Sequence, residues 1–198
     1  MFGADRVTAG EMKLLGRLRP GSIEASVRAG LALVPESRKQ EGLALILSVQ
    51  DNLLAAGLKK LFPHVWFTPA VALGAARALI ERLRVATPGP NRPIKTLSGG
   101  NQQKVVIGKW LQIGARVFIF DEPTRGIDVG AKAEIFALID QLVSEGAAVL
   151  MISSELNEIV SVCDRAYVMR DGRIAGELAR DELSEERLLK LAMHHDDA

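Results

Sequence analysis

The sequence has few of the features that mark secreted, membrane-spanning or disulfide-rich proteins. Cys163 is the only cysteine among its 198 residues. No apolar run approaches the length of a membrane span, and the first residues lack the apolar core of a signal peptide. Because disulfide frameworks need several cysteines and an oxidising compartment, these absences predict a soluble protein of a reducing compartment.

An excess of one charge and a cluster of metal-binding residues are also missing. The formal net charge is +1, which gives no sign of a nucleic-acid surface, so no nucleic-acid partner is expected. His64, His194 and His195 have no ligand-like companions in the sequence and are expected at the surface. The content of 48% hydrophobic and 25% charged residues is ordinary for a globular protein. At 198 residues the chain is long enough for one sizeable core with a smaller lobe attached.

A serine followed by two glycines marks the start of a helix. Ser98, Gly99 and Gly100 precede a segment whose apolar residues recur at helical spacing: Val105, Val106, Ile107, Trp110 and Leu111. A serine cap followed by residues without bulky side chains lets backbone N–H groups approach an anion closely. This segment therefore predicts a phosphate-binding helix start.

Two acidic residues follow a short apolar run. Residues 117–120, VFIF, form an uninterrupted apolar segment that is typical of a strand buried on both faces of a parallel sheet. Asp121 and Glu122 come directly after it. Open α/β sheets bind ligands beyond the carboxyl ends of their strands, so the two acids are well placed for a Mg-nucleotide. We expect Asp121 to hold the Mg²⁺ shell and Glu122 to orient and deprotonate the attacking water.

Together these motifs resemble those of the ATP-binding-cassette (ABC) ATPases. LSGGN is similar to their signature loop, FIFDE to their Walker B strand, and RGID to the D-loop, which ends at Asp128. The GGNQQK and EPTRGIDVGAK spellings resemble more narrowly the second cassette of the tandem ATPase subunits of monosaccharide importers. The resemblance implies an α/β fold with a parallel-sheet P-loop-type ATPase core, ATP and Mg²⁺ as cofactors, and the following site residues: Glu122 and Ser154 as catalytic, Asp121 as metal-binding, and Ser98, Gly99, Gly100, Gln102, Glu36 and Asp128 as nucleotide-binding.

Glu36 and Ser154 owe their assignments to the resemblance alone. PESRKQEGL is similar to the family's VPEDRKxxGL, with Glu36 where most cassettes carry a glutamine that senses Mg²⁺ and contacts the membrane subunit. Without the resemblance, this segment indicates a charged surface turn. Ser154 stands where most cassettes have a histidine that contacts the γ-phosphate. A hydroxyl donates one hydrogen bond but carries no positive charge, so slow hydrolysis is expected at this site.

The phosphate-binding loop itself is not found in the sequence. No GxxxxGK followed by Ser or Thr occurs in the 198 residues. FGADRVTAGEM resembles the family segment that follows the helix after that loop, which implies one partial ABC domain over residues 1–198, with the first strand and the phosphate loop missing. We expect such a chain, alone, to bind ATP weakly and to expose a sheet edge.

The remaining elements are predicted from their spacing and turn residues. Residues 43–93 form a helical lobe, with Ser48 and Asp51 capping one helix and Thr68 with Pro69 opening another, whose Leu73, Ala76, Ile80 and Leu83 share a stripe. In the family this lobe docks the transmembrane subunit. The other expected elements are an edge strand near residues 12–15, a helix over 23–29, strands over 31–34 and 147–153 (both buried), a helix through 135–142, a hairpin at Asp171–Gly172 that adds an edge ribbon, and a helix near Leu188.

Three functions are compatible with these motifs. In the first, the chain is the C-terminal cassette, or a piece of it, of an ATPase that drives monosaccharide uptake. Its partners would be a second cassette, a transmembrane permease and, indirectly, a periplasmic sugar-binding protein. It would lie in the cytoplasm, peripheral on the inner face of the membrane. The second, a DNA-maintenance ATPase, needs long heptad repeats for which the chain has no room. The third is a regulatory or vestigial module that binds a partner without hydrolysing ATP.

Overall fold

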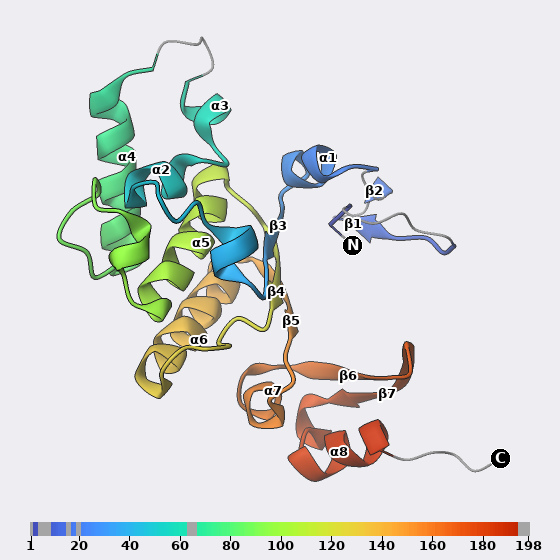
Figure 1. Cartoon of the computed structure of the whole chain (residues 1–198). Helices are drawn as coiled ribbons and strands as arrows, with labels where there is room; N and C mark the ends of the chain where they lie inside the picture. The colour runs from blue at the N-terminus through green and yellow to red at the C-terminus, as the bar shows by residue number, and fades with distance from the viewer. Residues whose placement is uncertain (1, 4–8, 15–16, 19–20, 63–66, 194–198) are drawn as a thin grey trace. The chain divides into compact units, whose positions relative to one another are not determined.

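A computed structural model describes residues 2–3, 9–14, 17–18, 21–62 and 67–193, and the chain divides into two compact units, Met1–Ile152 and Ser153–Ala198 (Figure 1). The predictions for His64, His194 and His195 lie outside the described residues. Among the residues that are described, no helix is both long and apolar enough to cross a bilayer.

The helices and strands of each unit follow in chain order. The first unit contains β1 (Lys13–Leu14), β2 (Arg17–Leu18), α1 (Ile23–Arg28), β3 (Leu31–Val34), the π-helical turn η1 (Arg38–Gly42), α2 (Val49–Leu54), α3 (Leu58–Leu61), α4 (Pro69–Arg82), the 3₁₀ turn η2 (Ile94–Thr96), α5 (Gly99–Ile113), β4 (Val117–Asp121), α6 (Val129–Ser144) and β5 (Ala148–Ile152). The second contains α7 (Leu156–Val162), β6 (Arg165–Arg170), β7 (Arg173–Ala179), the 3₁₀ turn η3 (Arg180–Glu182) and α8 (Glu185–Met193).

A parallel sheet of order β3-β4-β5 forms the centre of the first unit. Its middle strand, β4, carries Phe118 and Phe120, which are both fully buried and stack with ring centroids 5.9 Å apart. The apolar stripe predicted within residues 135–142 is buried on α6 and belongs to the same hydrophobic cluster. The predicted parallel α/β core is therefore confirmed, with β4 as its central strand.

One strand prediction needs correction, and another is confirmed. The last strand of the sheet, β5, was expected to be buried, but its residues alternate between exposed and half-buried, and Ile152 is 47% exposed. The reason is that β5 is an edge strand: among the described residues it pairs only with β4. The edge strand expected near residues 12–15 is confirmed as the short strand β1, which pairs with β2 in an antiparallel ribbon of its own.

The helical lobe packs directly against α5. Gly108 of α5 makes this possible, since a Cβ atom there would lie 2.6 Å from side-chain carbons of both Leu53 and Leu83. The capping box between Ser48 and Asp51 forms as predicted. The Thr68 side chain, in contrast, makes no capping hydrogen bond at the start of α4.

The buried stripe of α4 also differs from the predicted one. It consists of Ala72, Ala76, Leu79 and Leu83, whereas Leu73 and Ile80 are only half-buried. Both sets satisfy helical spacing. The observed stripe has two alanines, which let the helix backbone come close to its neighbours. This close approach favours the observed stripe over the predicted one.

The second unit is a hairpin covered by a helix. Asp171 and Gly172 have φ values of 49° and 74°, as a tight hairpin turn between β6 and β7 requires. Leu188 of α8 packs on Ala166 and Leu178 of the hairpin. The hairpin and the last helix are thus confirmed, but within the described residues the hairpin is a two-stranded sheet of its own rather than a ribbon added to the parallel sheet.

Candidate functional site

The two predicted acids stand at the carboxyl end of the central strand. Asp121 is the last residue of β4 and pairs in register with Ile152 of β5. The N–H of Glu122 donates to the carbonyl of Ile152 over 2.9 Å, so the parallel ladder extends one residue beyond the strand. Glu122 then adopts φ 48°, a left-handed conformation that costs energy for any residue other than glycine. Strain of this kind persists where the surrounding structure holds it, often at a functional site.

The Asp121 carboxyl lies in an environment that disfavours its negative charge. Burial raises its pKa above the ordinary value, and the nearby carboxylates of Glu122 and Glu41 raise it further. Sequence reasoning missed Glu41, which lies on η1 and carries no motif signal. A divalent cation beside Asp121 would offset the repulsion, so the charges fit Mg²⁺.

The described residues contain no group of three histidine, cysteine or acidic side chains that could hold a metal ion by themselves. Mg²⁺ usually binds to one or two protein carboxylates and takes its other oxygens from phosphates and water. Asp121 therefore fits a cation that arrives with a nucleotide, rather than one held in a protein cage.

Ser98 begins α5 as predicted. Its hydroxyl accepts hydrogen bonds from the backbone N–H of Asn101 over 3.5 Å and from the Asn101 side-chain amide over 2.9 Å. The helix runs for 15 residues and ends at Gly114, which has φ 77°. Its amino end carries the positive pole of the helix dipole and the unpaired N–H groups of the first turn, which is the chemistry that a phosphate needs.

Gly99 and Gly100 are both surrounded by other parts of the chain. A Cβ atom at Gly99 would lie 2.8 Å from Nη2 of Arg38, and one at Gly100 would lie 2.6 Å from the Cβ atom of Ala131 on α6. Gly99 is half-buried and Gly100 is buried. The glycines therefore have packing reasons within this chain, in addition to any role in admitting a phosphate.

Gln102 is buried rather than exposed to a ligand. It is 4% exposed, and its amide nitrogen donates to the carbonyl of Leu97 over 3.0 Å. In this conformation the Gln102 side chain fixes the position of Leu97, the residue just before Ser98. Two residues on, Lys104 pairs with Glu134 of α6 over 2.7 Å, which fixes α5 against α6.

Asp128 marks the start of another helix. Its carboxylate accepts a hydrogen bond from the N–H of Ala131 over 3.0 Å and so caps α6. The residue is exposed, at the end of the turn that follows Glu122. The loop predicted as a D-loop is therefore built between two well-defined points, the end of β4 and the cap of α6.

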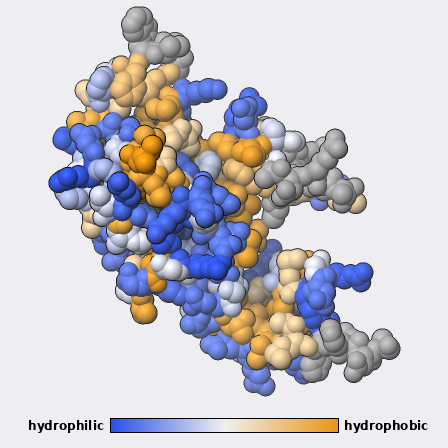
Figure 2. All heavy atoms as spheres, viewed as in Figure 1, coloured by the Kyte–Doolittle hydropathy of each residue, from blue (hydrophilic) through white to orange (hydrophobic). Residues whose placement is uncertain are grey.

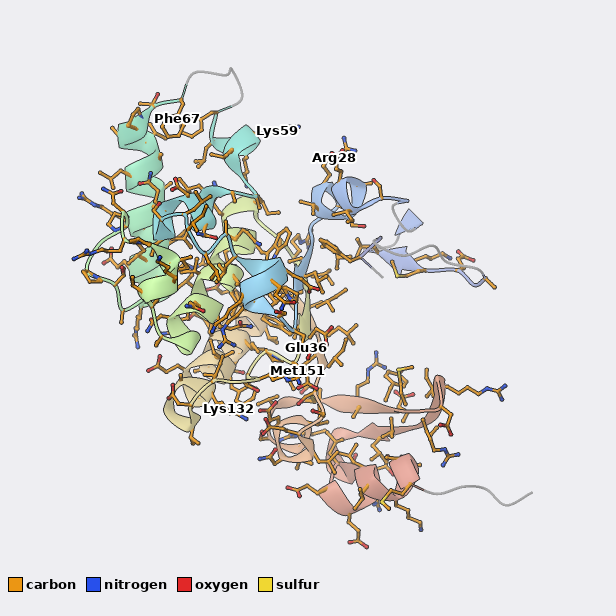
Figure 3. The ribbon with its side chains drawn as sticks, viewed as in Figure 1. Arg28, Glu36, Lys59, Phe67, Lys132 and Met151 are labelled. Atoms are coloured by element: carbon orange, nitrogen blue, oxygen red, sulfur yellow. The ribbon has the colours of Figure 1, made fainter. Side chains whose placement is uncertain are left out.

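Glu36 lies just past the end of β3 (Figure 3). It pairs with Arg125 of the loop that follows Glu122. Arg38, two residues further on, donates to the carbonyls of Arg125 and Gly126 over 2.9 and 3.1 Å. Burial lowers the pKa of the Arg38 guanidinium, although a guanidinium remains charged in proteins. Sequence reasoning also missed Arg38: it is a matched position of the PESRKQEGL segment, but the resemblance assigned it no role.

Ser154 belongs to the second unit, two residues after the end of β5. It is exposed. Its neighbour Ser153 donates to Glu158 over 2.8 Å and accepts from the N–H of Glu155 over 3.1 Å, which shapes the start of α7. Because β4 and β5 are parallel neighbours, the strand ends that precede Glu122 and Ser154 lie side by side, as the sequence predicted.

The parts of the site in the first unit meet at one edge. The Cβ position at Gly99 is 3.4 Å from the carbonyl oxygen of Gly126, so the start of α5 contacts the loop after Glu122. A cavity of about 360 Å³ opens elsewhere, at the amino ends of β4 and β5, where Arg116 and Ala147 line it. That cavity is at the opposite end of the strands from Asp121 and carries none of the predicted site residues.

Comparison with known proteins identifies close relatives. A family model described as "ABC transporter" matches residues 1–125. The chain is 48% identical over 197 residues to the ribose import ATP-binding protein RbsA 3 of Rubrobacter xylanophilus, covering 97% of this chain and 39% of the relative. It is 46% identical over 195 residues to the arabinose import ATP-binding protein AraG 2 of Burkholderia ambifaria, covering 98% of this chain and 38% of the relative. The chain thus spans less than half the length of these relatives.

Solved structures share the fold at much lower identity. A nucleotide-free ATP-binding cassette from an ABC transporter superposes with a TM-score of 0.77 at 20% identity, over 98% of this chain and 81% of that chain. An ATP-binding cassette in a dimeric post-hydrolysis state, bound to ADP and Pi, gives a TM-score of 0.74 at 19% identity, over 90% of this chain and 77% of that chain.

Proposed function

The chain belongs to the ABC transporter family, and we propose that it acts as a cassette of an ATP-binding subunit that couples ATP binding and hydrolysis to monosaccharide import. The observation that carries the proposal is the 48% identity, over almost the whole chain, to a protein named for ribose import. The relative named for arabinose import is nearly as similar. A monosaccharide is therefore a better-supported class of cargo than any one sugar.

The site residues divide into two groups by what they can do. Asp121 offers a carboxylate whose charge is unfavourable without a cation, and Glu122 offers a carboxylate on a strained turn that can accept a proton from water. Bound Mg-ATP would supply the cation and the reacting phosphate. Ser98 and Gly99 present the amino end of α5, where we propose that a second cassette brings its own nucleotide.

The other predicted residues shape this edge. Asp128 caps α6, Gln102 holds the approach to Ser98, and Glu36 is tied to Arg125. We propose that they set the shape of the nucleotide edge, with Asp128 and Glu36 exposed enough to touch a ligand or a partner.

The proposed partners are a second cassette, a transmembrane permease and, through the permease, a periplasmic sugar-binding protein. The subunit would then lie on the cytoplasmic face of the inner membrane. The lobe over residues 43–93 is the proposed permease contact. Large apolar side chains are exposed on the lobe, among them Ile46 at 84% and Phe67 at 56%. Figure 2 shows an apolar patch beside α2 and a hydrophilic surface over η1.

A non-catalytic cassette is the second candidate. The observation that favours it is Ser154, a hydroxyl where a histidine would be expected for efficient hydrolysis. In this case the chain would still bind its partners, and its Ser98 end would still act on nucleotide held by the other cassette. The two candidates differ in whether Glu122 contributes to turnover.

Sugar uptake by the assembled transporter in vesicles tests both candidates. We expect Gly99→Val to lower uptake by roughly a hundredfold, because a side chain there keeps donors from a phosphate. Glu122→Gln should lower it far less, because Ser154 already weakens that site. Gly74→Val is the control, since the space around Gly74 on α4 is open. Equal losses in the Gly99 and Glu122 variants would contradict this ranking, and normal uptake in the Gly99 variant would contradict the proposed role of α5.

A further inference from the structure

One arginine connects three segments that are far apart in the sequence. Arg38 donates from Nη1 to the carbonyl of Arg125 over 2.9 Å and from Nη2 to the carbonyl of Gly126 over 3.1 Å. The ion pair between Glu36 and Arg125 joins the same two segments a second time. The planar fork of a guanidinium suits two neighbouring acceptors, and an ammonium group cannot replace it in that geometry.

The same guanidinium lies against the first residue of α5. A Cβ atom at Gly99 would stand 2.8 Å from Nη2 of Arg38, closer than ordinary contact, and 3.5 Å from Cζ, within ordinary contact distance. Because Nη2 is at the far end of a flexible side chain, the guanidinium can yield to a methyl group there, but only by moving from its present position beside the two carbonyls. A side chain at position 99 would therefore displace Arg38.

The other end of η1 is fixed to the body of α5. The Lys109 ammonium donates to the carbonyl of Gly42 over 2.8 Å. Gly42 itself packs so closely on Val106 that a Cβ atom there would lie 3.1 Å from a methyl group. Segment 36–42 is thus bonded to α5 at its Gly42 end, lies against the first residue of α5 through Arg38, and is bonded by Arg38 to the loop after Glu122.

We propose that Arg38 is a positioning residue that holds the Arg125–Gly126 turn and the first residue of α5 in one arrangement with segment 36–42. A displacement of segment 36–42 would then move the turn before Asp128 and the Ser98 end of α5 together. The consequence for turnover rests on the proposed function, whereas the structural connection does not. Two experiments separate them.

Hydrogen exchange on the 198-residue chain tests the connection itself. In Arg38→Ala, we expect the amides of residues 125–128 and 100–102 to exchange at least about tenfold faster, because the turn loses its two donors. Lys39→Ala removes the same charge one residue away and should leave these amides unchanged. The strand amides of β3 and β4 report whether the variant is folded. If Arg38→Ala does not fold, Arg38→Lys replaces it in the experiment. Unchanged exchange at residues 125–128 in a folded Arg38 variant would overturn the proposal.

A double-mutant cycle on the assembled transporter tests the consequence for turnover. We expect Arg38→Ala to lower kcat for ATP and to leave KM unchanged, because the proposal has Arg38 act through the turn and the start of α5 rather than on the nucleotide. Gly99→Ala should displace the guanidinium and give at least as large a loss, because its side chain also lies at the proposed phosphate approach. The double variant should be no worse than Gly99→Ala alone, since Gly99→Ala already displaces the guanidinium. If the losses in kcat of the two single variants multiply in the double variant, the proposal is overturned. A wild-type transporter without ATPase activity would instead refute the proposed function, and exchange alone would then decide the role of Arg38.

Discussion

The contact between Gly100 and Ala131 gives a sharp test of how the start of α5 is positioned. Carbon atoms in ordinary contact are about 3.5 to 4.0 Å apart. A Cβ atom at Gly100 would be 2.6 Å from the Cβ atom of Ala131, so Gly100→Ala must push α5 and α6 apart by roughly 1 Å. Inserting a methyl group into a close-packed contact costs about 1 to 3 kcal/mol.

The gain in helix propensity offsets part of this cost. Replacing glycine by alanine within a helix stabilises it by up to about 1 kcal/mol. Gly74 on α4 isolates that gain, because a Cβ atom there meets nothing within 4 Å. We expect Gly74→Ala to stabilise the chain by about 0.5 to 1 kcal/mol, and Gly100→Ala to be about 1 to 3 kcal/mol less favourable than Gly74→Ala.

Urea denaturation followed by circular dichroism measures both variants. A third variant, Gly100→Ala with Ala131→Gly, removes the colliding atom and should recover most of the packing cost relative to the sum of the single changes. The reasoning is refuted if Gly100→Ala is as stabilising as Gly74→Ala, or if the effects of Gly100→Ala and Ala131→Gly simply add.

Three further outcomes are expected. Because the folded-state pKa of Asp121 is raised, its protonated form favours folding at low pH, and this contribution is lost as pH rises through the folded pKa. Without divalent cations, Asp121→Asn should therefore be more stable than the wild type at pH 7, by less than about 1 kcal/mol because the group is only partly buried. Below the ordinary aspartate pKa range the two proteins should be equally stable. Urea denaturation that gives the same stability difference at both pH values would contradict this. Asn52 is 4% exposed and its side chain bonds to the N–H and carbonyl of Ala44, so Asn52→Ala should lower the free energy of unfolding by roughly 2 to 3 kcal/mol, and a loss under about 0.5 kcal/mol would show those bonds to be unimportant. Calorimetric titration of the 198-residue chain with Mg-ATP should show no micromolar binding, because these residues contain no GxxxxGK sequence, and micromolar affinity would mean that another segment binds the phosphates.

Much of the local structure follows from the sequence because neighbouring residues determine it. The capping box at Ser48 and Asp51, the cap at Ser98 and the turn at Asp171–Gly172 involve groups at most three residues apart. An apolar strand followed by two acids likewise predicts its own place in a parallel sheet. Ser98, Asp121 and Glu122 could therefore be placed before any tertiary contact was known.

Only the tertiary structure decided features that depend on distant neighbours. An apolar run does not indicate whether a strand has a neighbour on one side or on both. The sequence therefore did not predict that β5 is an exposed edge strand. Glu41 raises the pKa of Asp121 from across 80 positions of sequence, and Arg38 meets the carbonyls of Arg125 and Gly126 from 87 and 88 positions away. A charged residue in a turn has no periodic signal, because its partner is determined by how the sheet and α5 bring the loops together.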